Sequence, residues 1–335
     1  MIRHLDRSVK GLTVLMALAI AATASACTDQ SSTSDVADEV VLIAYDSFTP
    51  QDGIFDEFTA ATGATVKVVS AGDTGTMVSK AVLSAGNPEG DVMWGIDNTF
   101  LSRAQQARVL ERYEAVDEGD ICVNYDKNWF ADQGIPVPTG FTDFVRPEYR
   151  GLLAVQDPVN SSPGLGFLLA TIAHHGDEWQ DYWRALRANE VHVSPDWSTA
   201  YYEDFSGSSG DGPHPLVVSY GSSPPAEVVY SETPIDEPPT GVIEATCFRQ
   251  IEYAGVLRGT RNPELAERLL DFLLSKTFQE SMPLTLFVFP VNPEAELPEV
   301  FEKFAVRASD PLTMSPDDIE QNRSAWLDDW RSIFS

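Results

Sequence analysis

The sequence predicts an α/β protein with two lobes joined by hinge strands. Its 335 residues are more than a single hydrophobic core usually occupies. Short apolar runs, typical of buried strands, alternate with amphipathic stretches, typical of helices, as they do in α/β lobes. Two further strand-like passages, 120–125 and 241–253, bracket the middle of the chain. If both passages cross between the lobes, the first lobe is discontinuous and the second is an insertion.

The individual elements follow from apolar runs and helix caps. Strands are predicted at 40–47 (VVLIAYDS), 65–70 (TVKVVS) and 91–96 (DVMWGI), and short helices at 53–60 and 76–83. Later helices are predicted from a capping side chain, a first-turn proline or an amphipathic pattern, beginning near Pro163, Glu178, Trp197, Pro263 and Pro316. We therefore expect lobe 1 to comprise 40–123 and 245–335, and lobe 2 to comprise 124–244.

The N-terminal segment predicts export. Three basic residues precede an apolar run at 11–26 that is short for a membrane span and ends in small residues, so 1–26 reads as a signal peptide. The tetrapeptide Ala-Ser-Ala-Cys at 24–27 resembles a bacterial lipobox, which predicts that Cys27 is acylated and anchors the protein to the outer face of the cell membrane. Ordinary signal peptidase also accepts Ala-x-Ala and would release a soluble extracytoplasmic protein. The polar stretch 27–39 suits a flexible tether.

The net charge of the chain limits the kinds of partner that its surface can attract. The chain has 22 basic and 51 acidic residues, a net charge of −29. Such a surface repels nucleic acid and anionic lipid and could concentrate a cationic ligand, although it also suits simple solvation in a salty medium.

Without Cys27, the remaining cysteines are Cys122 and Cys247. We expect them to form a disulfide between neighbouring strands, the alternative being two separate buried thiols.

Catalytic and metal motifs are missing from the sequence. It contains no Gly-x-Ser-x-Gly, His-Glu-x-x-His, P-loop or Gly-x-Gly-x-x-Gly pattern. The pair His174-His175 lacks further ligands at a familiar spacing. We therefore expect neither an enzyme nor a bound metal or cofactor.

Several passages resemble the thiamine-binding proteins of bacterial ABC transporters, and they occur in family order across about 41–334. They are YDSF (45–48), GIDN (95–98), VNYDK (123–127), QDP (156–158), SSPGLG (161–166), WS-x-AY (197–201), VSY (218–220), SP (223–224), NPELA (262–266), FQ (278–279) and FPV (289–291). The resemblance implies a type II periplasmic-binding-protein fold, a monomer without catalysis, and a permease and an ATPase as partners. It also implies thiamine or a thiamine phosphate as ligand.

Thiamine has two flat rings, one permanently cationic, and a hydroxyethyl arm that can carry phosphate. Aromatic faces attract such a cation, and Tyr45, Trp197, Tyr220 and Phe287 lie at predicted strand ends or helix starts. Tyr201 belongs to the same family segment as Trp197. The alternative for each ring is simple core packing.

Polar candidates also follow predicted strands. Asp73, with Thr74, stands in a glycine-flanked turn where its carboxylate could meet the ligand, or could bond only to its own backbone. Asp97 and Asn98 end a strand and could line the same cleft.

Ser161 and Ser162 precede the helix that begins near Pro163. The end of such a helix favours an anion, so one hydroxyl could dock the ligand's arm while the other caps the helix.

The main alternative is capture of ferric iron on the same fold. The adjacent Tyr201 and Tyr202 motivate it, because phenolates are hard oxygen ligands.

The sequence departs from the family pattern at three places. The connection 110–120 is short, Ala226 replaces an aromatic residue, and Phe287 replaces a tryptophan.

Overall fold

The computed structural model describes residues 39–208 and 212–335. The predicted signal peptide, Cys27 and the tether up to residue 38 lie outside the described residues. Among the helices that are described, none has both the length and the apolar character needed to cross a membrane.

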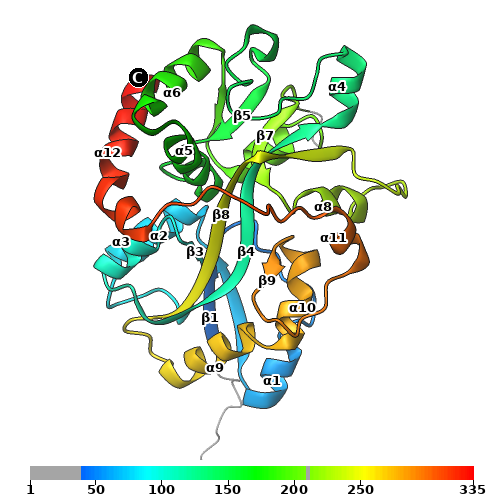
Figure 1. Cartoon of the computed structure of the whole chain (residues 1–335). Helices are drawn as coiled ribbons and strands as arrows, with labels where there is room; N and C mark the ends of the chain where they lie inside the picture. The colour runs from blue at the N-terminus through cyan, green and yellow to red at the C-terminus, as the bar shows by residue number, and fades with distance from the viewer. Residues whose placement is uncertain (1–38, 209–211) are drawn as a thin grey trace, which may run out of the picture. The chain divides into compact units, whose positions relative to one another are not determined.

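All the described strands belong to one mixed sheet with the order β2-β1-β3-β8-β4-β7-β5-β6, and β9 pairs with β4 (Figure 1). Their bounds are β1 Glu39–Ala44, β2 Thr65–Ser70, β3 Val92–Asp97, β4 Leu110–Asp126, β5 Leu153–Gln156, β6 His192–Ser194, β7 Leu216–Tyr220, β8 Thr240–Leu257 and β9 Phe289–Pro290. β1, β2 and β3 form one flank of the sheet, and β7, β5 and β6 form the other.

The long strands β4 and β8 pair antiparallel and join the two flanks. They pass through the middle of the molecule in Figure 1, between the two groups of helices. Residues 110–120, interpreted from sequence as a connection that is short for the family, belong to β4, which is 17 residues long. This half of β4 is rich in Glu and Asp, so it lacks the apolar run by which a buried strand is recognised.

Helices cover the sheet within each lobe (Figure 1). Their bounds are α1 Asp56–Thr62, α2 Thr74–Leu83, α3 Leu101–Gln106, α4 Lys127–Gln133, α5 Ser162–His175, α6 Trp179–Ala188, α7 Trp197–Thr199, α8 Pro224–Val229, α9 Pro263–Leu273, α10 Lys276–Thr285, α11 Glu299–Phe304 and α12 Pro316–Phe334, with short 3-10 turns at Pro147–Tyr149 and Gly176–Glu178. The helix predicted from Trp197 is α7 followed by a π-helical turn, Ala200–Asp204.

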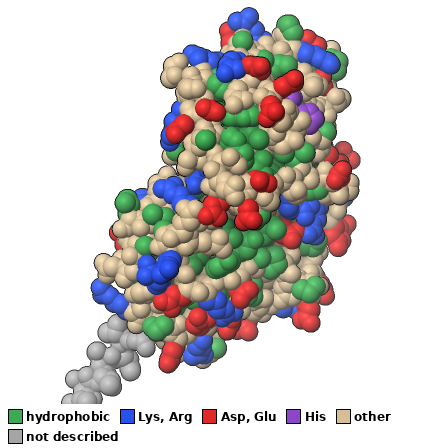
Figure 2. Space-filling model, turned by 60° about the vertical axis from the view of Figure 1, so that its left-hand side comes forward, with side chains coloured by type: hydrophobic (Ala, Val, Ile, Leu, Met, Phe, Trp, Pro, Cys, Tyr) green, Lys and Arg blue, Asp and Glu red, His purple; other side chains and the backbone are tan. Residues whose placement is uncertain are grey.

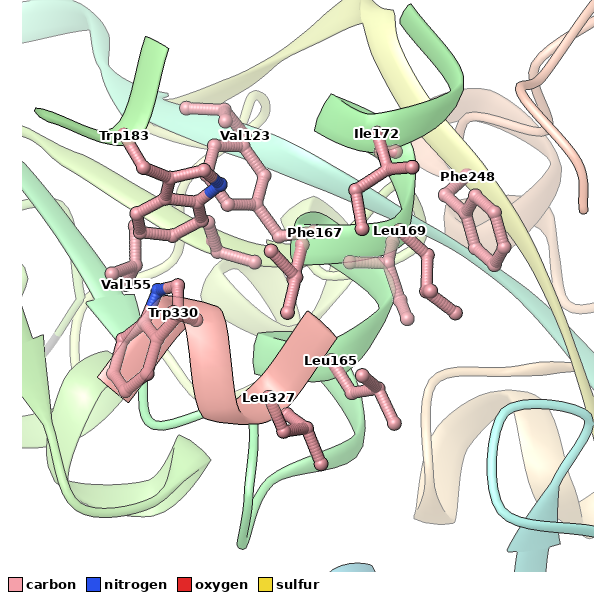
Figure 3. Packing of buried hydrophobic residues seen from close by; sticks show 14 of the residues in the cluster. Val123, Val155, Leu165, Phe167, Leu169, Ile172, Trp183, Phe248, Leu327 and Trp330 are labelled. Carbon is pink, nitrogen blue, oxygen red and sulfur yellow. The ribbon is translucent and has the colours of Figure 1, made fainter. Parts of the chain in front are cut away.

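The last helix departs from its expected place in lobe 1. Trp330 of α12 packs edge-on against Trp183 of α6, at 5.8 Å between ring centroids, and both belong to the core that contains Phe167 of α5. Figure 3 shows Leu327 and Trp330 packed beside these lobe 2 side chains. α12 also contacts α3, so the C-terminal helix spans both lobes.

A third segment crosses between the lobes in front of β4 and β8 (Figure 1). The backbone at 305–314 bonds to residues beside the hinge, including Val306 N–H to the Gly221 carbonyl at 2.9 Å and Leu312 N–H to the Cys247 carbonyl at 2.8 Å. Cys122 of β4 and Cys247 of β8 are joined by a disulfide in this region, and both are buried with Ala308. Covalent and hydrogen-bonded links therefore converge where the lobes meet.

Replacing both cysteines by alanine is expected to lower the free energy of unfolding by about 2–4 kcal/mol, because the bridge closes a long loop of the unfolded chain. The bonded residues are 125 apart in sequence. Urea unfolding of the variant and the oxidised parent measures the difference. Equal midpoints and slopes would contradict a stabilising role for the bridge.

Candidate ligand-binding site

A cavity of about 270 Å³ lies where the ends of β1, β7, α2 and α7 meet the loop between α10 and β9. Its lining comes from both lobes and is mainly aromatic and polar. The lining residues are Tyr45, Asp46, Ser47, Thr49, Asp73, Thr74, Pro163, Trp197, Ser198, Tyr201, Tyr202, Tyr220, Ser223, Ala226, Tyr230, Glu252, Thr285, Leu286, Phe287 and Val288.

Trp197 is the centre of the aromatic group in lobe 2. Its ring stacks on Tyr201 at 5.1 Å and 16°, meets Tyr202 edge-on at 5.5 Å, and lies 6.3 Å from Tyr220. The indole N–H donates to Ser219 Oγ at 3.0 Å, which fixes the orientation of the ring. The site thus presents a rigid set of aromatic surfaces.

Tyr45 reaches the cavity from lobe 1 because Gly95 makes room for it. A Cβ added at Gly95 would stand 2.3 Å from Tyr45 Cδ1, and the φ angle of +96° at this glycine is one that other residues rarely adopt. Burial and the neighbouring carboxyls of Glu252 and Asp117 raise the pKa of Tyr45, so its phenol stays neutral.

Asp73 joins the two lobes at the cavity wall. Its Oδ1 accepts from Thr74 N–H at 2.7 Å, where it caps α2, and its Oδ2 accepts from Trp197 N–H at 3.3 Å. Burial raises the pKa of Asp73 to about 6, partly offset by these hydrogen bonds. Thr74 is buried, and its hydroxyl donates to the Gly95 carbonyl at 3.1 Å.

Three carboxyl groups form a row beneath the cavity. Glu252 of β8 pairs directly with Asp97 of β3 on one side and with Asp117 of β4 on the other. All three are buried, with exposed fractions of 0% for each aspartate and 4% for the glutamate. Like charges directly opposite one another on neighbouring strands repel, so ionisation of this row destabilises the sheet.

The row has few partners in the described part of the chain. Asp97 Oδ2, both carboxyl oxygens of Asp117 and Glu252 Oε2 are buried without a hydrogen-bond partner. Burial, together with the charge of Asp97, raises the pKa of Glu252 to about 8. Burial and the charge of Glu252 hold the pKa of Asp117 well above its usual range. A cation in the cavity would relieve this repulsion.

Asp97 and Asn98 were expected in the cleft, but neither lines the cavity. Asp97 Oδ1 accepts from the backbone and hydroxyl of Thr99. The Asn98 amide bonds the backbone of β8 at Arg249 and Ile251. Both residues therefore hold the sheet beside the site, and Asp97 acts on the cavity through its charge.

Ser161 and Ser162 were expected to serve two roles, one hydroxyl docking the ligand and the other capping α5, and the structure shows neither role. Both are buried, neither lines the cavity, and neither hydroxyl makes a capping bond to α5. Ser161 instead favours the ionised form of Asp73. Together with the backbone hydrogen bonds to Asp73, it offsets part of the rise in the Asp73 pKa that burial causes. The α5 end reaches the cavity through Pro163 instead.

Of the residues predicted from sequence, seven come together at the cavity: Tyr45, Asp73, Thr74, Trp197, Tyr201, Tyr220 and Phe287. Phe287 has a positive φ of 54°, which is rare for a bulky residue and typical of functional sites. Its ring meets Tyr230 edge-on at 5.7 Å, so aromatic side chains from the two lobes meet at the rim.

Sequence reasoning missed Glu252, Asp117 and Tyr230. The sequence of β8 did indicate a buried polar site. Gln250 and Glu252 occupy alternate positions that face the interior, where a strand usually has apolar residues. Tyr230 gave none, because it follows a short helix and is 68% exposed.

The adjacent tyrosines are poorly placed to bind iron. Tyr201 donates its hydroxyl proton to Glu227 Oε1 at 2.8 Å and stacks on Trp197. Burial and Glu227 raise the pKa of Tyr201 well above its ordinary value, which disfavours the phenolate that ferric iron requires. The described residues also contain no group of three or more His, Cys, Asp or Glu side chains that could hold a metal ion.

The fold and this inter-lobe cavity define a two-lobed solute receptor. The family profile of bacterial extracellular solute-binding proteins matches residues 96–309, and the chain belongs to that family.

Individual relatives agree with this assignment. The thiamine-binding periplasmic protein of Salmonella typhimurium is 28% identical over 314 residues, covering 88% of this chain and 93% of that protein. A solved structure of a periplasmic thiamin binding protein superimposes with a TM-score of 0.78 at 24% identity, covering 89% of this chain and 96% of that one. A ferric binding protein from Campylobacter jejuni gives a TM-score of 0.67 at 15% identity, covering 88% and 99%. The two solved structures establish the type II periplasmic-binding-protein fold.

Glu252→Gln is expected to stabilise the ligand-free protein at pH 8 by at least about 1 kcal/mol. The carboxyl binds its proton more tightly in the folded state, so its contribution favours folding at low pH and is lost as the pH rises from about 4.5 to about 8. Urea unfolding across this range measures the effect, with Glu111→Gln, an exposed acid on β4, as control. Parallel pH profiles for Glu252→Gln and the parent would contradict this assignment.

Gly95→Ala is expected to destabilise the protein by about 1–3 kcal/mol, because it forces a side chain into a left-handed backbone position and against the Tyr45 ring. Thermal unfolding measures the loss. Gly134→Ala also has a positive φ, but no atom lies within 4 Å of its added Cβ, so it isolates the backbone cost. Equal losses in the two variants would show that the Tyr45 contact adds nothing.

Proposed function

We propose that this solute-binding protein captures thiamine, or a thiamine phosphate, outside the cytoplasm and delivers it to the permease and ATPase of an ABC importer. One observation carries the proposal. The cavity combines aromatic walls with a buried row of carboxyl groups that lacks a basic partner in the described structure. A flat cationic heterocycle satisfies both features at once.

The aromatic side chains account for the rings of the ligand. A cation over the face of Trp, Tyr or Phe gains about 0.5–2 kcal/mol per ring, and more when water is excluded. Trp197, Tyr220 and Tyr45 surround the cavity from both lobes. A bound ring system would therefore hold the lobes together by contacts with each.

Charge favours the unphosphorylated vitamin. Asp46, Asp73 and Glu252 line the cavity, and no Lys, Arg or His is among the described lining residues. A phosphate would lack a cationic partner there, although Ser198 and Ser223 could donate hydrogen bonds to a hydroxyethyl arm. We therefore expect the affinity to fall from thiamine to its monophosphate and further to its diphosphate.

The relatives support the same ligand and cellular location. The curated protein from Salmonella typhimurium is named for thiamine binding and for the periplasm. Anchoring through Cys27 is part of the proposal, with a soluble extracytoplasmic form as the alternative. We also propose that the receptor acts as a monomer.

The decisive experiment is calorimetric titration of the purified protein with thiamine and its two phosphates. Trp197→Ala is expected to weaken thiamine binding by about tenfold or more, because it removes the central ring of the aromatic group. Trp326→Ala, a partly buried tryptophan of α12 that does not line the cavity, is the matched control. Unchanged affinity in Trp197→Ala, or no heat with any of the three compounds, would overturn the proposal.

The pH dependence of the same titration tests the carboxyl row. A bound cation lowers the pKa of Glu252 and of Asp73, whose values of about 8 and about 6 place their titration near neutrality. Binding should release protons, so affinity should rise between pH 5 and pH 8. Repeating the titration in buffers of different ionisation enthalpy counts the protons. A flat profile without proton release would exclude the row as counter-charge, even if thiamine binds.

A further inference from the structure

A second cavity, of about 520 Å³, lies among α2, α3, α12 and the loop after β5. It shares no described lining residue with the aromatic cavity. Figure 2 shows the side of the molecule on which α12 and α3 lie in Figure 1. The lining residues are Ser79, Ser102, Arg103, Gln106, Val159, Asn160, Glu320, Arg323, Ser324, Leu327, Asp328 and Arg331.

This cavity concentrates positive charge in a strongly acidic protein. Three of the 22 basic residues line it, namely Arg103 of α3 and Arg323 and Arg331 of α12. Arg331 pairs with Asp328 at 3.0 Å. In the part of the chain that the structure describes, no ion pair engages Arg103 or Arg323.

Arg323 is held in place without a full set of partners. Its guanidinium carbon lies 4.4 Å from the centroid of the Phe100 ring, which fixes the side chain over α3. Its Nε is buried and has no hydrogen-bond partner in the described structure. A buried N–H donor left unpaired is destabilising, and an acceptor in the cavity would remove that cost.

In the described structure the nearby acids form no ion pair with Arg103 or Arg323. Glu320 accepts a hydrogen bond from Gln106, and Asp328 is engaged by Arg331. Asp97 attracts Arg323, but it lies beyond ion-pair distance. Burial and the charge of Arg103 lower the pKa of Arg323 to about 10, which still leaves the Arg323 guanidinium charged near neutral pH.

We propose that the cavity between Arg103 and Arg323 binds a small oxyanion such as inorganic phosphate. Guanidinium groups match the oxygens of phosphate or sulfate through paired, charge-assisted hydrogen bonds. The Ser102 and Ser324 hydroxyls line the same space and can donate further bonds. Because α3 belongs to lobe 1 and α12 packs mainly on lobe 2, the bound anion would bridge the two lobes.

The test is calorimetric titration with inorganic phosphate and with sulfate, at constant ionic strength and without thiamine. Binding is expected for the parent, and Arg103→Met and Arg323→Met should each weaken it by about tenfold or more. Arg184→Met removes an exposed, ion-paired arginine of α6 and should leave the affinity unchanged. Two variants on different helices keep the result interpretable if one of them fails to fold.

Three outcomes would overturn the proposal: no binding of either anion to the parent, equal binding by all variants, or binding only to phosphatidylglycerol vesicles. The last would identify a lipid head group as the source of the oxyanion. Thiamine titration of Arg323→Met separates this site from the proposed function, because loss of phosphate binding while thiamine still binds shows that the two ligands occupy different cavities.

Discussion

The structure is built around a repulsion. Asp97, Glu252 and Asp117 stand opposite one another on the three central strands, and all three are buried. Removing a carboxylate from water without a partner costs several kcal/mol, so the row persists by holding protons or by facing a cation. The neutral phenols of Tyr45 and Tyr220 and the aromatic walls complete a surface whose chemistry suits a flat cation. Ligand binding and the stability of the sheet therefore share one source.

The same row lies on the strands that join the two lobes. Asp117 and Glu252 belong to β4 and β8, which pair across the lobe boundary together with the segment 305–314. Asp73 bonds Trp197 across the cavity, and Phe287 meets Tyr230 at its rim. The two lobes are thus in contact across the cavity in the described structure. A ligand that contacts both walls binds this closed conformation more tightly than an open one. The disulfide beside Ala308 limits how far the crossing strands can separate locally.

Sequence patterns carried the fold and most of the aromatic site, since strand ends and capping residues are local features. They could not show which acids meet, because Asp97, Asp117 and Glu252 are far apart in the chain and are brought together by register alone. The acidic first half of β4 hid a strand for the same reason, as its burial depends on β8 and β9 rather than on its own composition. Ser161 and Ser162 looked like capping or docking groups, yet neither hydroxyl caps α5, and the Ser161 N–H donates to the Asp157 carbonyl at 3.0 Å in the turn before the helix. Local chemistry predicts candidates, and tertiary register decides among them.

Opposite charges occupy the two cavities, and Asp97 connects them electrostatically. Burial raises the pKa of Asp97 to about 6, and the charge of Arg323 opposes part of that rise; burial and the charge of Asp97 in turn raise the pKa of Glu252. An anion near Arg323 would weaken the hold of that arginine on Asp97, whereas a cation near Glu252 would favour the ionised row. Any coupling between charges placed in the two cavities would pass through Asp97, and thermodynamic linkage requires such an effect to be reciprocal. The arrangement of Arg323, Asp97 and Glu252 provides a physical route for that coupling through three buried or half-buried groups.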